Sequence, residues 1–112
     1  MTSREAQARI AQHAAAFNAA VQSAAWDSFA DRFTQDATMR FVGVPAGPFI
    51  GRAAIAQAYA EQPPTDKLVI RGVDSTGDVD TVSFAWSAGG GGVMRLTWEG
   101  PRVANLEITF DD

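Results

Sequence analysis

The sequence has no cysteine and only one histidine. Without cysteine, a disulfide framework, a thiol nucleophile and a thiolate metal site are all excluded. One histidine is too few for a two-histidine iron site or for a zinc site of histidine and cysteine ligands. We therefore expect no metal and no cofactor. The missing cysteines also fit a reducing, cytoplasmic location.

Long apolar runs and basic clusters are missing too. No apolar stretch reaches about 18 residues, and the N-terminal part lacks the hydrophobic region of a secretory signal. The formal net charge is -4, from 13 acidic and 9 basic residues spread along the chain. We predict no membrane-spanning segment, and no nucleic-acid partner because no basic cluster could neutralise phosphates.

The remaining composition is that of a folded chain. Hydrophobic residues make up 46% and charged residues 20% of the sequence. A chain of 112 residues is too short for two independent hydrophobic cores. We expect residues 1–112 to form one domain.

The first half of the sequence shows helical periodicity. One face of a long helix over residues 4–25, which Thr2 or Ser3 can cap, is formed by Ile10, Ala14, Phe17 and Val21. A second, shorter helical face is formed by Trp26, Phe29, Ala30 and Phe33. A third helix is expected over residues 52–62, because Pro63 and Pro64 cannot continue it.

The second half changes to a period of two. Strands are predicted over residues 68–74, 81–88, 93–99 and 103–110, after a short strand over 38–42. The loop 45–51 can form part of a pocket mouth or simply a rigid turn, and the glycine run 89–92 is interpreted as a flexible hairpin tip. Helices followed by hairpins favour an α+β fold with an antiparallel sheet.

Parity predicts the register of the last hairpin. Placing Leu106 on the same face as Leu96 requires an odd loop, most simply residues 100–102. That register sets Arg95 opposite Glu107 on the outer face, as a cross-strand ion pair.

The alternation gathers large apolar side chains on one face of the sheet. With the first helix and the early strand, they are predicted to line a hydrophobic ligand pocket; the alternative is a filled core. The set is Phe17, Phe33, Met39, Phe41, Phe84, Trp86, Met94, Leu96 and Trp98.

Residues 26–59 read WDSFADRFTQDATMRFVGVPAGPFIGRAAIAQAY and resemble the nuclear transport factor 2-like superfamily, which includes steroid delta-isomerases and SnoaL-like polyketide cyclases. The similarity depends on FADRFTQDAT and on GRAAIAQAY, and with the following strands it covers nearly the whole chain. It implies a cone-shaped half-barrel in which three N-terminal helices pack on a curved, mixed but mainly antiparallel sheet around a pocket. It also implies a homodimer formed through the outer face of the sheet.

The resemblance shows that steroid isomerase residues are replaced. Aligned through the shared DAT, the family's catalytic tyrosine falls at Phe17 and its aspartate base at Phe41. Its second aspartic acid falls near Met94 once the strand Leu96-Thr97-Trp98 is matched. All three positions are apolar, so the base and the oxyanion-hole donors of that mechanism are missing. A tyrosine of the family's third helix is retained at Tyr59.

His13 and Tyr59 are the titratable pair that we expect inside the pocket. His13 lies one turn before Phe17 on the same helical face, where it would act as a base, bind a ligand, or simply occupy a satisfied core position. Tyr59 would donate its hydroxyl to a ligand carbonyl or form an aromatic wall.

Three functions remain open from the sequence. The first is a small-molecule binding domain for a steroid-, polyketide- or lipid-like ligand. The second is an isomerase- or cyclase-type enzyme in which His13 and Tyr59 are catalytic. The third is a homodimeric interaction module whose cavity is filled.

Overall fold

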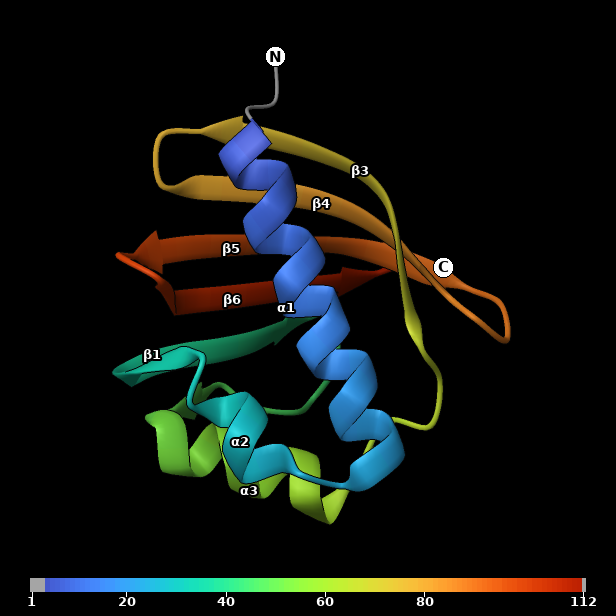
Figure 1. The fold of residues 1–112 in the computed structure, drawn as a ribbon. Helices are drawn as coiled ribbons and strands as arrows, with labels where there is room; N and C mark the ends of the chain where they lie inside the picture. The colour runs from blue at the N-terminus through green and yellow to red at the C-terminus, as the bar shows by residue number, and fades with distance from the viewer. Residues whose placement is uncertain (1–3, 112) are drawn as a thin grey trace.

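The computed structural model describes residues 4–111, which form three helices and six strands (Figure 1). The helices are α1 (Arg4–Ser23), α2 (Trp26–Ala30) and α3 (Arg52–Glu61). The strands are β1 (Phe33–Val42), β2 (Phe49–Ile50), β3 (Leu68–Thr76), β4 (Val79–Trp86), β5 (Gly91–Glu99) and β6 (Arg102–Phe110). The predicted α+β fold is confirmed, while the predicted cap at Thr2 or Ser3 lies outside the described residues.

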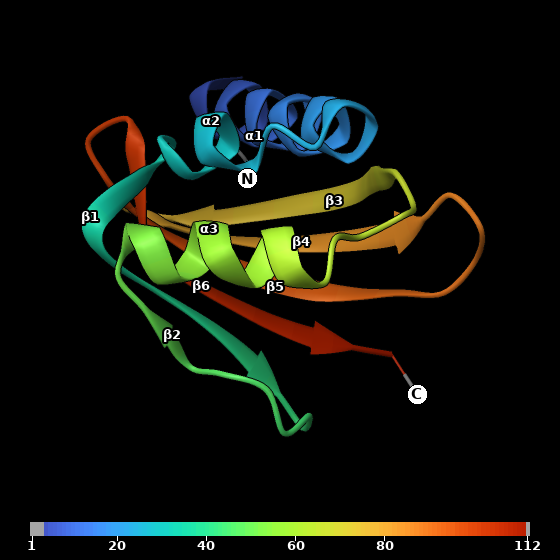
Figure 2. The same ribbon diagram turned by 90° about the horizontal axis from the view of Figure 1, so that it is seen from below.

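All six strands belong to one sheet in the order β2-β1-β6-β5-β4-β3. Strands β1 and β6 run parallel, and the other neighbours run antiparallel, as a mixed but mainly antiparallel sheet requires. The sheet is strongly curved, α1 crosses its concave face, and α3 lies across the opening seen from below (Figure 2). This arrangement is the predicted cone-shaped half-barrel.

Helix α1 packs on the sheet through one face. The buried residues are spaced three or four apart, as an amphipathic helix requires. They are Ala6, Ile10, His13, Ala14, Phe17 and Ala20. Small alanines between larger side chains let the helix lie close to the strands, and His13 is the one polar residue among these six.

The beginning of β1 differs from the prediction. Phe33 starts a strand rather than ending a helical face, because the backbone oxygen of Arg32 accepts a hydrogen bond from Val103 N at 2.9 Å. The register of β1 against β6 then shifts between Phe33 and Thr38. Within this irregular stretch Arg52 donates two hydrogen bonds to the carbonyl of Phe33, at 3.0 and 2.8 Å. These are long-range contacts that local periodicity does not encode.

The last hairpin has the predicted register but a different turn. Arg95 pairs with Glu107 and Leu96 with Leu106. The turn itself is Gly100-Pro101, because Glu99 pairs with Arg102, and an irregularity between Thr97 and Trp98 restores the register. A short turn and a bulge therefore replace the predicted odd loop.

The glycine run is only partly a hairpin tip. Gly91 and Gly92 are buried residues of β5. A Cβ added at Gly91 would lie 2.2 Å from the carbonyl oxygen of Phe84, and one at Gly92 would lie 2.2 Å from that of Thr109. Close packing of backbone on both sides, rather than flexibility, therefore requires glycine at these two positions.

Candidate functional site

A cavity of about 360 Å³ lies between the concave face of the sheet, α1 and α3. Its wall consists of His13, Phe17, Met39, Phe41, Val44, Ala46, Phe49, Ala58, Tyr59, Gln62, Pro64, Leu68, Phe84, Trp86, Met94, Leu106, Ile108 and Phe110. Val44 is 40% exposed and Phe110 is 37% exposed, so these two side chains mark the mouth. The volume falls in the range of about 300–1,000 Å³ that ligand pockets occupy.

Most of the predicted pocket residues share this wall. They are His13, Phe17, Met39, Phe41, Tyr59, Phe84, Trp86 and Met94. Phe33, Leu96 and Trp98 do not line this cavity. They lie on the same inner face but in its closed part, where they are 0%, 0% and 5% exposed. The strand alternation identifies the face of the sheet, but it does not show where along that face α1 closes the space.

The sequence also missed several wall residues. Leu106, Ile108 and Phe110 are spaced two apart on β6, so the alternation that puts Leu106 on the inner face puts the other two there as well. Gln62 and Pro64, which follow α3, had no signal beyond the proline that ends the helix. Their place in the wall depends on the path of the chain from α3 to β3.

The three positions where steroid isomerases carry polar catalytic groups all lie in the wall. They are Phe17, Phe41 and Met94. Among the described residues that line the cavity, none is an aspartate, a glutamate, a lysine or an arginine. Chemistry that needs a carboxylate base therefore has no such group in this wall.

His13 is a wall residue enclosed by aromatic rings. Its ring centroid lies 5.2 Å from that of Phe29, 6.0 Å from Phe33 and 6.3 Å from Trp98. Burial, with a smaller contribution from the charge of Arg32, lowers the pKa of His13 from 6.5 to about 3. The imidazole is thus neutral near pH 7. Its Nδ1 is buried and has no hydrogen-bond partner in residues 4–111.

Tyr59 lies in the same wall and is held by ring contacts. It stacks on Trp26 with centroids 4.8 Å apart, and its edge contacts involve Phe17 at 6.2 Å and Phe29 at 5.5 Å. Burial raises the pKa of the Tyr59 hydroxyl above its ordinary value. The group therefore keeps its proton and can donate a hydrogen bond into the cavity.

Comparison with protein families decides the membership of the chain. The model of the SnoaL-like domain matches residues 2–94. The chain belongs to the SnoaL-like domain family. A search of curated proteins gave no match.

Solved structures share the fold of this SnoaL-like domain. A proposed ketosteroid isomerase from Kribbella flavida is 19% identical, with a TM-score of 0.72 over 90% of this chain and 76% of that one. An NTF2-like protein of unknown function from Burkholderia xenovorans is 15% identical, with a TM-score of 0.74 over 96% and 86%. A protein with a ketosteroid isomerase-like fold from Catenulispora acidiphila, solved with trimethylamine, is 16% identical, with a TM-score of 0.70 over 86% and 82%. These likenesses establish the NTF2-like fold.

The described part of the SnoaL-like domain offers neither a metal site nor a membrane-spanning helix. Residues 4–111 contain no group of three or more side chains of histidine, cysteine, aspartate or glutamate placed to hold a metal ion. None of the described helices combines the length and the apolar character needed to cross a bilayer.

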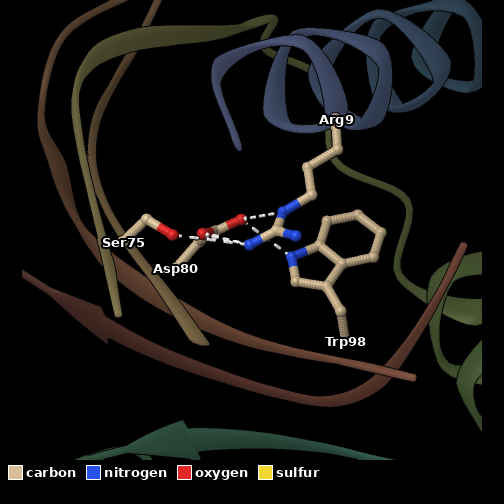
Figure 3. A network of polar contacts seen from close by, with 4 residues as sticks. All are labelled: Arg9, Ser75, Asp80 and Trp98. Carbon is tan, nitrogen blue, oxygen red and sulfur yellow. Dashed lines mark hydrogen bonds and ion pairs between the residues drawn. The ribbon is translucent and has the colours of Figure 1, made fainter. Parts of the chain in front are cut away.

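A polar network closes the other end of the SnoaL-like domain, and sequence reasoning missed it (Figure 3). Asp80 on β4 is 0% exposed and points toward α1. It accepts hydrogen bonds from Arg9 Nε at 2.6 Å, Arg9 Nη2 at 2.7 Å and Trp98 Nε1 at 2.8 Å. Arg9 also lies over the Trp98 ring, with Cζ 5.4 Å from its centroid. This network joins α1 to β4 and β5.

Hydrogen bonds from neighbouring side chains stabilise the ionised form of Asp80. Burial acts to raise the pKa of Asp80, but hydrogen bonds from Arg9, Ser75 and Trp98 outweigh it and lower the pKa below 3.8. The sequence does contain a signal for this position. Side chains alternate between the two faces of a strand, so Asp80, two residues before the inward-facing Val82, must also face inward. The predicted strand begins at residue 81, two residues after the observed start at Val79, and so leaves Asp80 out.

Proposed function

We propose that this SnoaL-like domain binds a small, predominantly apolar molecule of the steroid-, polyketide- or lipid-like kind inside the cavity. The observation that carries the proposal is the wall itself, in which His13, Tyr59 and Gln62 are the polar side chains among eighteen lining residues in the described part of the chain. Such a surface favours apolar ligands because their transfer from water releases about 25 cal/mol for each Å² buried.

The size of the cavity limits the ligand. At the packing density of protein interiors, about 0.75, a cavity of 360 Å³ encloses roughly 270 Å³ of ligand atoms. This volume corresponds to a compact molecule of a few fused rings or a medium-length chain. The half-exposed Val44 and Phe110 at the mouth let a longer ligand extend outward.

Acid–base catalysis is less well supported than binding. A general base works best when its pKa lies near the working pH. The pKa of His13 is lowered to about 3, so its neutral ring is a weak proton acceptor. Tyr59 is a donor rather than a base, since burial raises the pKa of its hydroxyl. The isomerase- or cyclase-type alternative would need a base that the wall does not supply.

A filled interaction module is also less well supported. A cavity of about 360 Å³ remains open among the described side chains, and a packed core leaves few voids larger than a water molecule. An unfilled apolar cavity of this size lowers the stability of the fold, because the side chains around it lose packing contacts that a bound molecule would restore.

Titration with N-phenyl-1-naphthylamine, a neutral probe whose fluorescence rises in apolar surroundings, tests the proposal. We expect saturable binding to the wild type. Ala58 is half-buried in the wall of α3, and Ala58→Phe would place a ring in the cavity. We expect this variant to weaken probe binding by about tenfold or more, about 1.4 kcal/mol.

Ala60→Phe is the matched control, because Ala60 lies on the same helix but is exposed. It should bind the probe like the wild type. Either of two results would contradict the proposal: no saturable rise with the wild type, or the same affinity in both phenylalanine variants.

A further inference from the structure

His13 lies at the inner end of the cavity. The three rings that surround it, Phe29, Phe33 and Trp98, all belong to the closed core and do not line the wall. One helical turn further along α1, Phe17 contacts Trp86, which is itself a wall residue, at a centroid distance of 5.9 Å. The cavity thus begins where the imidazole borders the aromatic core, and it extends toward the mouth at Val44 and Phe110.

The imidazole is 2% exposed, and no protein group satisfies its buried Nδ1 within residues 4–111. Leaving a buried polar atom unpaired costs about 1–3 kcal/mol, so native structures nearly always provide a partner. Because no hydrogen bond at Nδ1 selects a tautomer, the neutral ring can present either a donor or an acceptor. His13 also lines the cavity, so a bound molecule that brings one polar group to the imidazole would give this ring the hydrogen-bond partner that the protein does not supply.

The surroundings of His13 favour a ligand group of one charge type over the others. Arg32 is half-buried outside the wall, yet its positive charge is felt at the imidazole. It disfavours a cationic amine and favours the electron-rich oxygen of a hydroxyl or carbonyl. A carboxylate would have to leave water for a wall with no cation among its described residues. A neutral oxygen group therefore fits better than either ion.

We propose that the ligand is an uncharged molecule that hydrogen-bonds to His13 through one hydroxyl or carbonyl oxygen, while its apolar body points toward the mouth. This inference rests on the proposed function of the cavity and narrows the class of ligand. His13 is a binding residue in this arrangement and takes part in no proton transfer. Tyr59, which is also in the wall, is the competing partner for the same oxygen.

Three probes with one ring skeleton test the inference by isothermal titration calorimetry: naphthalene, 2-naphthol and 2-naphthoate. With the wild type, we expect 2-naphthol to bind about five- to tenfold more tightly than naphthalene, which is the effect of one hydrogen bond to a previously unpaired group. We expect 2-naphthoate to bind most weakly of the three.

His13→Phe keeps a ring at the inner end but removes its nitrogen atoms. In this variant the preference for 2-naphthol over naphthalene should disappear, while naphthalene itself still binds. His13→Leu repeats the test with a smaller side chain if the phenylalanine variant fails to fold. Gln12→Leu is the matched control, because Gln12 is the exposed neighbour of His13 on α1, and it should keep the preference.

Tyr59→Phe separates the two polar wall groups. The inference is overturned if the preference for 2-naphthol survives in both His13 variants, if it is lost in Tyr59→Phe alone, or if 2-naphthoate binds most tightly. Failure of all three probes to bind the wild type would instead contradict the proposed function of the cavity.

Discussion

Two buried polar side chains on the concave side of the sheet, Asp80 and His13, differ in whether the protein supplies their hydrogen-bond partners. At the closed end, Asp80 is buried with three short hydrogen bonds from Arg9 and Trp98. At the inner end of the cavity, His13 is buried with an unpaired Nδ1. The first arrangement is complete within the protein, whereas the second lacks a partner that a ligand can supply. The difference distinguishes a structural site from a candidate binding site.

Helix α1 connects the two ends. Arg9, His13 and Phe17 follow one another at a spacing of four on the helical face that meets the sheet. Arg9 pairs with the buried carboxylate, His13 ends the aromatic core, and Phe17 lines the cavity. One helix thus seals the cone at one end and shapes the pocket at the other.

The largest effect is expected from truncating the packed end. Leu96 is 0% exposed in the closed core, whereas Met94, two residues away on the same face of β5, lines the cavity. Leu96→Ala should lower the free energy of unfolding by about 3–4 kcal/mol, through lost burial and a new void. Met94→Ala should cost about 2 kcal/mol, because one side of Met94 already borders empty space.

Urea denaturation of the two alanine variants measures this difference. Equal losses would show that the space beside Met94 is packed as tightly as the core around Leu96. The distinction between a closed end and an open end would then be wrong.

Removing the buried carboxylate should have the next largest effect. Asp80→Ala leaves Arg9 and Trp98 Nε1 without their acceptor. We expect a loss of about 3 kcal/mol in the free energy of unfolding, at the low end for a broken buried pair because the Arg9 side chain is 27% exposed and can reach water.

The exposed Asp78 provides the control for this variant. Asp78→Ala should stay within about 0.5 kcal/mol of the wild type in the same denaturation experiment. If both alanine variants unfold alike, the network around Asp80 contributes nothing measurable to stability.

A smaller effect is expected from mild acid, which acts on His13 at the inner end of the cavity. Since the pKa of His13 falls from 6.5 to about 3 on folding, the unfolded chain binds a proton that the folded chain excludes between these values. Stability is therefore complete above pH 6.5 and is lost as the pH falls, by about 2 kcal/mol between pH 6.5 and 4.5. Chemical denaturation across this interval measures the loss.

His13→Phe should remove most of this dependence, because phenylalanine does not titrate. Asp80 does not interfere in the same interval, since its lowered folded pKa places its own loss of stability below about pH 4. An unchanged slope in the variant would mean that His13 is not held neutral by burial.

Much of the fold follows from local patterns. The apolar stripe of α1 and the alternation on β4, β5 and β6 were strong enough to predict the α+β class, the strands and the pairing of Arg95 with Glu107. Predictions failed where the local structure depends on contacts with segments far away in the sequence. The two-residue strand β2 lies in a stretch of glycine and proline and exists only because β1 is beside it. The buried role of Asp80 requires Arg9, which is 71 residues away.

For the candidate site too, some features follow from the sequence and others only from the tertiary structure. The sequence by itself determined which side chains face inward, because the helical and strand periods set direction, and it placed His13 one turn before Phe17. Only the tertiary structure decided that Met94 borders a cavity while Leu96 is packed, and that Asp80 is paired while His13 Nδ1 is not. The physical reason is that periodicity acts over a few residues, whereas empty space and charge pairing depend on where the curved sheet brings α1 against strands far along the chain.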